Sequence, residues 1–600
     1  MIDNIFGDLM DDDVRTARAV ADRAGVRHRA RTVPAVPAPG HPLMLALTTS
    51  GPLPFDAAVC WFTAEAGDGS TTEGRIDFVP DEVCWDDAAW DYLRYWSAEL
   101  PPQPAGALVR YKVAARAGGS QTWTYADNQA GSAADATEFS LSFDGTGVPA
   151  WAREAVVYHI FVDRFYPGDG KPWLPAEDLG GFFGGTLRGV IQKLHYVESL
   201  GFNTIWLSPV FASPSHHGYD AVDYYRVEPR LGTNADLTEL IEAAHGRGIR
   251  VILDFVANHW SRLNATFQEA LADEHSPYHD WYTWRHWPDD YERYFDVPDL
   301  PQLNLKRGGA RDYLLDCARY WLEQGVDGFR LDFAYGPPLD FWTDFRRACR
   351  SMKPDCWLFG EVVHTPEVQA TFAGRLDGTL DFLLARGLRD TFGRDLWPID
   401  RFEAFLAAHE AFFPEGFVRP GFLDNHDMNR FLYLAGDRPE KLKLAALALF
   451  TLAGSPIVYY GTEAGVTQTR PIHEHGIGLF EMARMPMKWG PEQDRDLVAF
   501  FRRLIALRRG HPVLPVAKRR LLHLDAAAGT YAYLAGDPRS ERFGAGDVIA
   551  AFNLSAERRS IYLGVPGAAA VSDLLNGHDV VTEPDGLGVR LAPWGGAFIA

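Results

Sequence analysis

Eight short apolar runs, separated by helical patterns, constrain the fold of this chain more than any other feature. The runs lie at 156–161, 204–207, 250–255, 328–331, 357–360, 380–383, 418–423 and 456–459, and they are too short for helices. Helical patterns lie between most of them, for example at 237–245, 310–324 and 441–452. Repeated βα units predict a parallel sheet, and about eight units predict a closed (β/α)8 TIM barrel. A doubly wound open sheet is the alternative.

The regions on either side of these runs have a different pattern. Short alternating runs between Gly, Pro, Asn and Asp predict a β-sandwich at 31–148 and a second one at 511–600. The barrel is expected at 149–510, and the charged, alanine-rich residues 1–30 are expected to form a surface helix or a loose arm. The segment 260–306 is long for a loop and dense in Trp, Tyr, His and Asp, which predicts an inserted subdomain after the third strand.

Composition limits the partners and the compartment. The 600 residues include 58 basic and 80 acidic side chains, for a net charge of −22, which disfavours nucleic acid or an anionic membrane and favours a neutral or cationic ligand. The five cysteines show no metal-type spacing, which indicates free thiols in a reducing compartment. The first 18 residues lack a signal-peptide pattern, and the run 444–454 is too short to cross a bilayer. We therefore expect a cytoplasmic protein.

The fourth strand, Gly-Phe-Arg-Leu-Asp at 328–332, carries two charges inside an apolar run. Arg330 and Asp332 are two residues apart, so they project from the same face of the strand. Burying both is reasonable only if they satisfy each other or meet a ligand. Arg330 would keep Asp332 ionised, as a nucleophilic carboxylate requires; a structural ion pair is the alternative.

Three other strand ends turn abruptly polar. Asp254 and His259 lie at and beyond the tip of the third strand, Glu361 ends the fifth, and His426 and Asp427 follow the seventh. Taken singly, each of these residues also has a structural interpretation. Asp254 would orient its neighbours, and His259 would be a buried structural histidine. Glu361 would face solvent, and Asp427 would cap a helix. Desolvation at the end of an apolar strand would raise the pKa of Glu361, as a general acid needs.

Together these strand ends indicate a glycosidase site. In a barrel of this kind the carboxyl ends of the strands meet at one mouth, where Asp332, Glu361 and Asp427 would converge. One carboxylate would attack the anomeric carbon and another would protonate the leaving oxygen, with a separation of about 5–5.5 Å in a retaining enzyme. The third would hold sugar hydroxyls and stabilise the transition state.

In this order the motifs resemble the α-amylase family of glycoside hydrolases over about residues 151–510. The matching runs are 217–220 with 223–225, 254–259, 328–332, Glu361 with its strand, and 425–427. The resemblance implies that Asp332 is the nucleophile, Glu361 the acid/base and Asp427 the stabiliser of the transition state. It also implies that Arg330 holds Asp332 and that Asp254 supports the site. His259 and His426 would bind hydroxyls of the sugar, and Tyr219 would stack on its ring. The run 484–489 resembles a family stretch after the last strand and is interpreted as structural.

Within the family the chain resembles the group of neopullulanases, cyclomaltodextrinases and maltogenic amylases. That group carries an N-terminal sandwich and a Pro-x-Leu-Asn motif, matched here at 301–304. The sandwich is expected either to bind glucan or to pack against a second chain, and the resemblance suggests the second, a homodimer. Gly336 and Val363 depart from the group, which usually has Glu and Trp there, on the acceptor side of the cleft.

The predicted function is a retaining α-glucan hydrolase that cleaves α-1,4 bonds, with α-1,6 bonds as further targets. The expected substrates are maltooligosaccharides, cyclodextrins, pullulan or starch. The alternatives are a transglycosylase or sugar-isomerising enzyme of the same family and, in another class, an inactive glucan-binding protein. No cofactor is expected to be required. Calcium is not assumed, because the loop 166–170 offers few oxygen ligands. Asn258 matches a calcium ligand in many α-amylases, but the subgroup often lacks that site.

Overall fold

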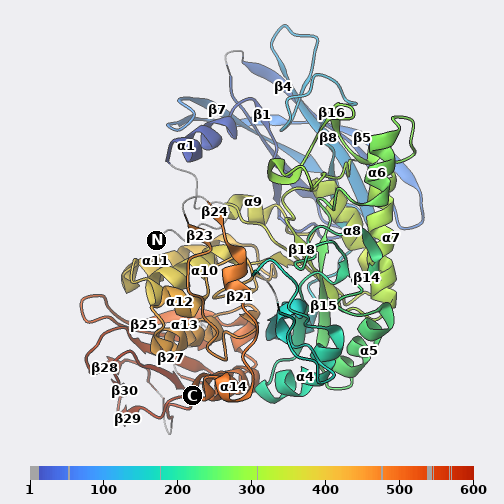
Figure 1. Cartoon of the computed structure of the whole chain (residues 1–600). Coiled ribbons are helices and arrows are strands. Elements are labelled where there is room, and N and C mark those ends of the chain that lie inside the picture. The colour runs from blue at the N-terminus through green and yellow to red at the C-terminus, as the bar shows by residue number, and fades with distance from the viewer. Residues whose placement is uncertain are drawn as a thin grey trace.

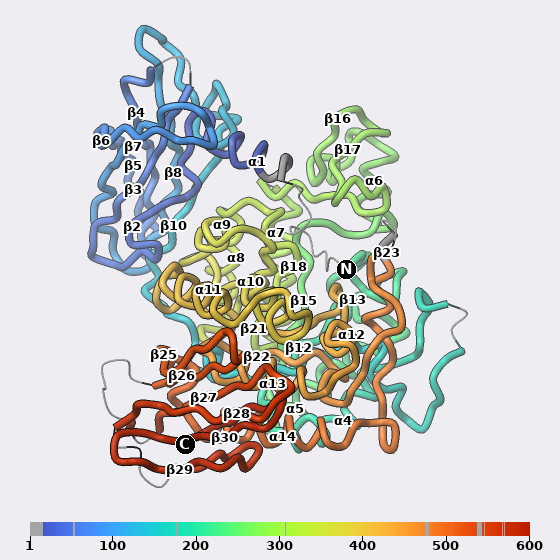
Figure 2. Tube along the Cα trace, turned by 90° about the vertical axis from the view of Figure 1, so that its left-hand side faces the viewer, coloured from blue at the N-terminus to red at the C-terminus, as the bar shows by residue number. Residues whose placement is uncertain are grey.

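The structure is a computed structural model that describes residues 12–51, 54–175, 178–306, 308–474, 477–536, 543–544, 546–566, 568 and 571–600. An eight-stranded parallel sheet forms its centre, and antiparallel β domains lie at the two ends of the chain (Figure 1). Figure 2 shows these two domains, in blue and red, on opposite sides of the central barrel. Of the predicted segment 1–30, residues 1–11 lie outside the described part, and α1 covers Asp12–Ala21.

The central sheet is a closed barrel whose strands follow one another in chain order. The strands are β11 (Val157–Ile160), β12 (Thr204–Leu207), β15 (Arg250–Val256), β18 (Gly328–Asp332), β19 (Trp357–Gly360), β20 (Gly378–Thr379), β21 (Gly421–Phe422) and β22 (Pro456–Tyr459). A parallel bridge between Gly378 and Val418 joins the sixth strand to the segment that leads into the seventh. The ring is therefore complete, which confirms the barrel and excludes the open sheet.

The closure depends on the small size of Gly378. A Cβ atom at this position would lie 1.6 Å from the carbonyl oxygen of Val418. The predicted strand at 380–383 is wrong, because the strand is Gly378–Thr379 and helix α10 (Phe382–Leu388) starts directly afterwards. Asp381 caps that helix by accepting a hydrogen bond from the backbone N–H of Leu384 at 2.9 Å.

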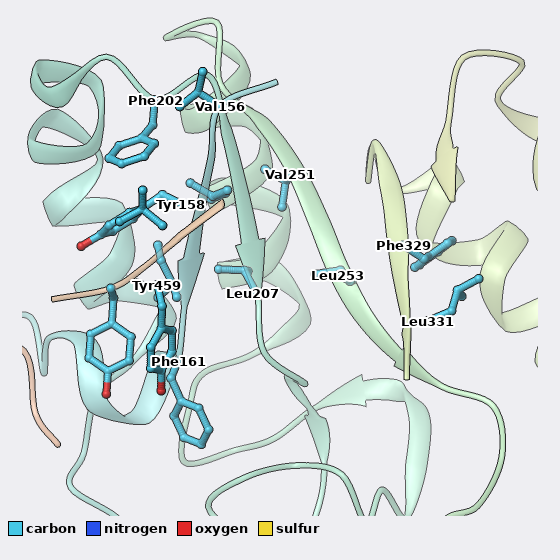
Figure 3. Close-up of a cluster of buried hydrophobic side chains, with 14 of the residues drawn as sticks. Val156, Tyr158, Phe161, Phe202, Leu207, Val251, Leu253, Phe329, Leu331 and Tyr459 are labelled. Carbon is cyan, nitrogen blue, oxygen red and sulfur yellow. The ribbon is translucent and has the colours of Figure 1, made fainter. Parts of the chain in front are cut away.

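Alternation along the strands separates two apolar layers. The side chains that face the helices form one large buried cluster, which includes Val251, Leu253 and Phe329 on neighbouring strands (Figure 3). The side chains that alternate with them belong to a second, smaller cluster, to which Trp206 and Ile252 belong. Arg330 and Asp254 share the alternation of this second set, so the charges enter the barrel interior and not the helix layer.

Helices connect the strands and cover the outside of the barrel. They are α4 (Leu187–Leu200), α5 (Asn234–His245), α7 (Gly309–Glu323), α8 (Leu339–Met352), α9 (Pro366–Ala370), α10, α11 (Ile399–Phe412), α13 (Pro439–Thr451) and α14 (Arg495–Gly510). Helix α5 begins with a capping box, in which Thr233 and Asp236 each accept a backbone hydrogen bond from the other residue. The three helical patterns in the sequence correspond to α5, α7 and α13.

An inserted subdomain separates β15 from α7, as the aromatic-rich segment predicts. It contains α6 (Ala265–Ala272), the short hairpin of β16 (Trp284–His286) and β17 (Asp290–Tyr291), and a helical turn at Tyr294–Asp296. An isolated antiparallel bridge joins His259, just past the third barrel strand, to Gln302. This bridge fixes the subdomain to the mouth of the barrel.

The N-terminal β domain is a sandwich of two antiparallel sheets. One sheet contains β1 (Val26–Arg27), β2 (Thr32–Val33), β3 (Leu43–Thr49), β6 (Val79–Asp86) and β7 (Asp91–Leu100). The other contains β4 (Phe55–Glu65), β5 (Thr71–Asp77), β8 (Ala107–Ala117), β9 (Thr124–Tyr125) and β10 (Phe139–Phe143). Arg110 on β8 forms an ion pair with Asp344 on α8 at 2.6 Å, so the sandwich rests on the helix that follows the fourth barrel strand.

The C-terminal β domain also has two sheets. Strands β25 (Lys518–Asp525), β26 (Thr530–Gly536), β27 (Val548–Asn553) and β31 (Gly596–Ile599) form one, and β28 (Arg559–Leu563), β29 (Asp579–Glu583) and β30 (Gly586–Leu591) form the other. All five cysteines are free thiols. In the described part of the chain, every helix is too short or too polar to span a bilayer.

Candidate active site

Strand register brings the charges of the barrel interior together. In the pairing of β15 with β18, Asp254 stands opposite Arg330, and Val256 stands opposite Asp332. In the pairing of β18 with β19, Leu331 stands opposite Gly360, one residue before Glu361. In this register Asp254 and Arg330 lie at one level of the barrel, and Asp332 and Glu361 lie two residues further toward the carboxyl ends of the strands.

The guanidinium of Arg330 is the centre of this group. Its Nη1 donates to Asp254 Oδ1 and to Asp332 Oδ1, each at 2.8 Å. Its Nη2 lies 2.6 Å from Glu361 Oε1 in an ion pair whose N–H bonds do not point at the oxygen. Three carboxyl groups from three strands therefore share one completely buried cation.

Burial controls the protonation of these carboxyl groups. It raises the pKa of Glu361 to about 7, as the apolar strand predicts, with Arg330 opposing the rise and Asp332 adding to it. Burial also raises the pKa of Asp332 to about 7, so Arg330 does not hold this pKa low as the sequence suggested. The reason is that one guanidinium faces several carboxyl groups, and the pKa of Asp254 is also raised, to about 6, mainly by burial. The group retains a proton close to neutral pH.

The pKa of Asp427 is shifted in the opposite direction, downward. Burial opposes its ionisation, but His426, Arg484 and Arg330 outweigh burial and hold its pKa well below the usual range. His426 Nε2 lies 3.1 Å from Asp427 Oδ2, and Arg484 Nη2 donates to Asp427 Oδ1 at 2.7 Å. The Nε of Arg484 also donates to the carbonyl oxygen of His426 at 2.9 Å. Asp427 is therefore an ionised carboxylate with a fixed orientation.

Sequence reasoning missed Arg484, because the run 484–489 was interpreted as structural. The side chain reaches Asp427 across 57 residues of chain. No local spacing could reveal this contact, since it depends on how the segment after the eighth strand crosses the mouth of the barrel.

An aromatic stack stands beside the carboxylates. Tyr219 lies parallel to His426, with ring centroids 5.1 Å apart and planes inclined by 4°. The Tyr219 hydroxyl lies 2.6 Å from His426 Nε2 and donates to Asp254 Oδ2 at 3.0 Å. Trp206 donates from its indole N–H to the same oxygen at 3.1 Å. Asp254 is thus held by three donors, which fits a supporting role.

His259 belongs to the same mouth but contacts a different surface. Its ring stacks on Tyr294 of the inserted subdomain, with centroids 4.2 Å apart and planes inclined by 17°. Burial lowers the pKa of His259 to about 3, so the imidazole is neutral. Its Nδ1 lies 3.2 Å from Asn258 Nδ2. The structure therefore brings Tyr219, Asp254, Arg330, Asp332, Glu361, His426 and Asp427 into one contact network, with His259 at its edge.

The three carboxylates reach solvent although their neighbours do not. The exposed fraction of the side chain is 9% for Asp332, 6% for Glu361 and 17% for Asp427. Arg330 and His426 are fully buried. Carboxyl groups that combine shifted pKa values with a small solvent-exposed area are candidates for reactive groups.

Gly336, one of the two departures from the subgroup, has a steric explanation. A Cβ atom at Gly336 would lie 2.1 Å from Asn258 Oδ1 and 2.8 Å from the ring of Phe333. The side chain of Asn258 therefore occupies the space that a residue at position 336 would need. Within the described residues, no three His, Cys, Asp or Glu side chains form a cluster that could hold a metal ion.

Comparisons with known proteins agree with this geometry. Residues 159–502 match the family model of the α-amylase catalytic domain. The chain is 39% identical to α-amylase 2 of Dictyoglomus thermophilum over 72% of its own length and 73% of that protein. It is 34% identical to neopullulanase 2 of Thermoactinomyces vulgaris over 75% of its length and 78% of that protein.

A solved structure extends the similarity to the flanking domains. A cyclomaltodextrinase structure superposes with a TM-score of 0.69 at 26% identity, covering 96% of this chain and 99% of the other. The sequence match, the ordered strand-end residues and the barrel with its inserted subdomain all indicate the same relationship. The chain belongs to the α-amylase family of glycoside hydrolases.

Proposed function

We propose that this enzyme hydrolyses α-1,4 bonds of α-glucans with retention at the anomeric carbon, with Asp332 as nucleophile, Glu361 as acid/base and Asp427 as stabiliser of the transition state. The observation that carries this proposal is the sharing of Arg330 by Asp332 and Glu361, which holds two solvent-touching carboxyl groups side by side. Retaining glycosidases need such a close pair, whereas inverting enzymes leave room for a water between them.

In the first step an oxygen of Asp332 forms a bond to the anomeric carbon while the glycosidic bond breaks. The proton of Glu361 passes to the leaving oxygen, so the free sugar departs as a neutral alcohol. The raised pKa of Glu361, about 7, supports this role because the proton is still present near neutral pH. The ionised Asp427 stabilises the positive charge that develops on the sugar ring.

In the second step water attacks the anomeric carbon and the bond to Asp332 breaks. Glu361, now ionised, takes the proton of the water and returns to its starting state. Arg330 remains paired throughout and compensates the negative charge that moves between Asp332 and Glu361. Two inversions give net retention.

Replacement of Asp332 by Asn tests the assignment. The neutral amide keeps the size of the side chain but removes the nucleophile, so kcat/KM on maltotetraose should fall at least about 10³-fold. Asp316→Asn, on an aspartate of α7 whose side chain is 64% exposed, is the matched control and should keep full activity. Near-normal turnover by Asp332→Asn would refute the role.

The substrate class is inferred from relatives named α-amylase, neopullulanase and cyclomaltodextrinase. We propose maltooligosaccharides, cyclodextrins, pullulan and starch as substrates, with α-1,6 bonds as secondary targets. A product profile from maltotriose, cyclodextrin, pullulan, starch, sucrose and trehalose tests this class. Longer or rearranged products would identify a transglycosylase or isomerising enzyme, and tight glucan binding without cleavage would identify an inactive binding protein.

We also propose that two chains pair through the N-terminal sandwich and that the enzyme acts inside the cell. Exposed aromatic side chains on the β6–β7 hairpin support pairing: Trp85 is 45%, Trp90 is 77% and Tyr92 is 63% exposed. Sedimentation of the wild type should give twice the mass of one chain, and Trp90→Ser should reduce the mass to that of one chain. A monomeric wild type would exclude pairing.

The proposal that the enzyme acts inside the cell is supported by a relative from Bacillus subtilis that is named intracellular maltogenic amylase.

A further inference from the structure

The guanidinium of Arg484 is held by two carboxylates. Its Nη2 donates to Asp427 Oδ1 at 2.7 Å, and its Nη1 donates to Glu481 Oε1 at 3.3 Å. The third nitrogen, Nε, donates to the carbonyl oxygen of His426. Every nitrogen of this cation therefore has an acceptor, and two of the three acceptors are carboxylates. Glu481 precedes Arg484 by three residues, in a helical turn at Phe480–Ala483.

The backbone that carries Arg484 is fixed by other parts of the chain. Arg430, which follows the seventh barrel strand, donates from Nε to the carbonyl oxygen of Ala483 at 2.8 Å. The hydroxyl of Tyr460, which follows the eighth, donates to the carbonyl oxygen of Met485 at 2.7 Å. Both donor side chains are fully buried. They place the segment, and the carboxylate three residues before Arg484 is left to act on the guanidinium.

Charge balance distinguishes this arrangement from a simple ion pair. Asp427 and Arg484 alone would form a neutral pair, whereas with Glu481 the three groups carry one net negative charge. Burial opposes the charged form of Arg484, but Asp427 and Glu481 outweigh burial and raise its pKa. Arg484 is therefore a cation shared by two carboxylates. These three side chains are called the mouth triad below.

Neighbouring groups do not cancel the charge of the mouth triad. His216 Nε2 lies 3.8 Å from Glu481 Oε1, but burial lowers the pKa of His216 to about 2, so this ring is neutral. Arg164 donates to a backbone carbonyl oxygen of the triad at 3.4 Å, and its charge is compensated by Asp163 at 2.9 Å. The charge of Arg330 is already shared by three other carboxyl groups.

We propose that Glu481 is a positioning residue for the reaction proposed above, and that it acts through Arg484 by keeping a negative charge on the mouth triad. This inference rests on the proposed function. Arg484 fixes the orientation of Asp427, but without a second carboxylate it would neutralise the group that stabilises the transition state. Glu481 compensates part of that positive charge. The triad then remains negative when the sugar ring becomes positive, while the neutral ring of the ground state gains little from it.

Glu481→Gln tests this role, because it removes the charge and keeps the shape of the side chain. On maltotetraose kcat should fall about tenfold and KM should change less than twofold, since only the charged transition state loses stabilisation. Glu481→Asp keeps the charge and should recover most of the loss. Glu198→Gln, at a 47% exposed carboxylate that pairs with Arg247 on the surface, is the matched control and should keep full activity.

Two inhibitors of the same shape test the charge directly. Glucosyl-deoxynojirimycin has a protonated nitrogen in its second ring, and anhydromaltitol is the same disaccharide with a neutral oxygen in that place. Glu481→Gln should raise the inhibition constant about tenfold for the cation and less than twofold for the neutral compound. An inhibition constant does not depend on the amount of folded enzyme, so partial unfolding of the variant would leave this comparison intact.

Full activity of Glu481→Gln, a loss that appears in KM, or equal changes for the two inhibitors would each overturn the proposal. A Glu481→Asp variant as slow as Glu481→Gln would overturn it too, because the charge would then not be the cause. A wild type that does not cleave maltotetraose would refute the proposed function itself, whereas an active wild type with an unaffected Glu481→Gln variant would refute only the role of Glu481.

Discussion

Arg330 contacts Asp254, Asp332 and Glu361 from one fully buried position, and this single side chain accounts for much of the chemistry at the residue scale. A buried cation that faces several carboxyl groups cannot keep all of them ionised, because its charge compensates only one. The pair Asp332 and Glu361 can therefore hold one proton near neutral pH, as a nucleophile and an acid together require.

The proposed role of Glu361 as acid gives a prediction that depends on the leaving group. Glu361→Gln removes the proton donor, so kcat/KM on maltotetraose should fall about 10²–10⁴-fold. Fluoride leaves without protonation, so the same variant should keep most of the rate of glycosyl-enzyme formation on α-maltosyl fluoride. Steady-state and burst kinetics on both substrates provide the measurement. Equal losses would argue that Glu361 acts structurally.

The pH dependence follows from the same two groups. Glu361 must be protonated and Asp332 ionised, and each has a pKa raised to about 7. We expect kcat/KM on maltotetraose to peak near pH 7 and to fall on both sides. On α-maltosyl fluoride the alkaline fall should vanish, because no proton is needed, while the acid fall remains. A flat acid limb would contradict a raised pKa for Asp332.

At this scale the sequence could predict which residues matter but not how their charges balance. Asp254, Arg330, Asp332, Glu361 and Asp427 follow from polar residues at the ends of apolar strands. Arg484 could not be predicted, because its contact with Asp427 spans 57 residues. The contact between Phe295 and Phe333 could not be predicted either, because these two rings become neighbours only after the subdomain has folded over the barrel.

At the scale of elements, helix α14 supports the end of helix α13. Arg508 of α14 donates to the carbonyl oxygens of Phe450 and Leu452 at 2.7 Å and also to that of Gly454. Helix ends leave carbonyl groups without partners inside the helix, and α13 is buried against the C-terminal domain. A guanidinium with several donors satisfies them where water cannot enter.

Arg508→Met should therefore destabilise the fold by about 3 kcal/mol, since buried carbonyl groups lose their donors. Urea unfolding followed by circular dichroism gives the free energy of unfolding. Arg503→Met, at an exposed position of the same helix, should change it by less than about 0.5 kcal/mol. A small effect of Arg508→Met would mean that water reaches the carbonyl groups of α13.

Element types were easier to predict than boundaries. Seven of the eight predicted strand regions overlap a barrel strand, because buried parallel strands appear in a sequence as short apolar runs. The prediction for 380–383 failed because Phe382 and Leu383 already belong to α10. The cap of this helix, Asp381, resembles the polar residues at the other strand ends, and so short a run with three apolar residues fits either element.

At the scale of the whole molecule, the described residues present no acidic or histidine cluster that would hold a metal ion. Asn258 turns its amide nitrogen toward His259 and its oxygen toward Gly336. We propose that catalysis and folding need no calcium. Dialysis against EDTA should leave kcat/KM and Tm unchanged, with a calcium-supplemented sample as the control. A lower Tm that calcium restores would show a structural ion.

The order of domains along the chain was predictable, since each change of fold class changes the spacing of apolar residues. The way in which the domains pack was not. The contact between the N-terminal sandwich and α8 depends on Arg110 and Asp344, which lie 234 residues apart. The sequence does not show that a charged residue on a strand surface will pair with one on a distant helix.

The seam of the barrel, where Gly378 meets Val418, limits how this enzyme could be altered. Backbone approaches backbone so closely there that even a methyl group has no room, so only glycine at position 378 lets the ring of strands close. New specificity would have to be introduced through the loops and the inserted subdomain. Directed evolution confined to strand residues should yield unfolded variants far more often than altered products.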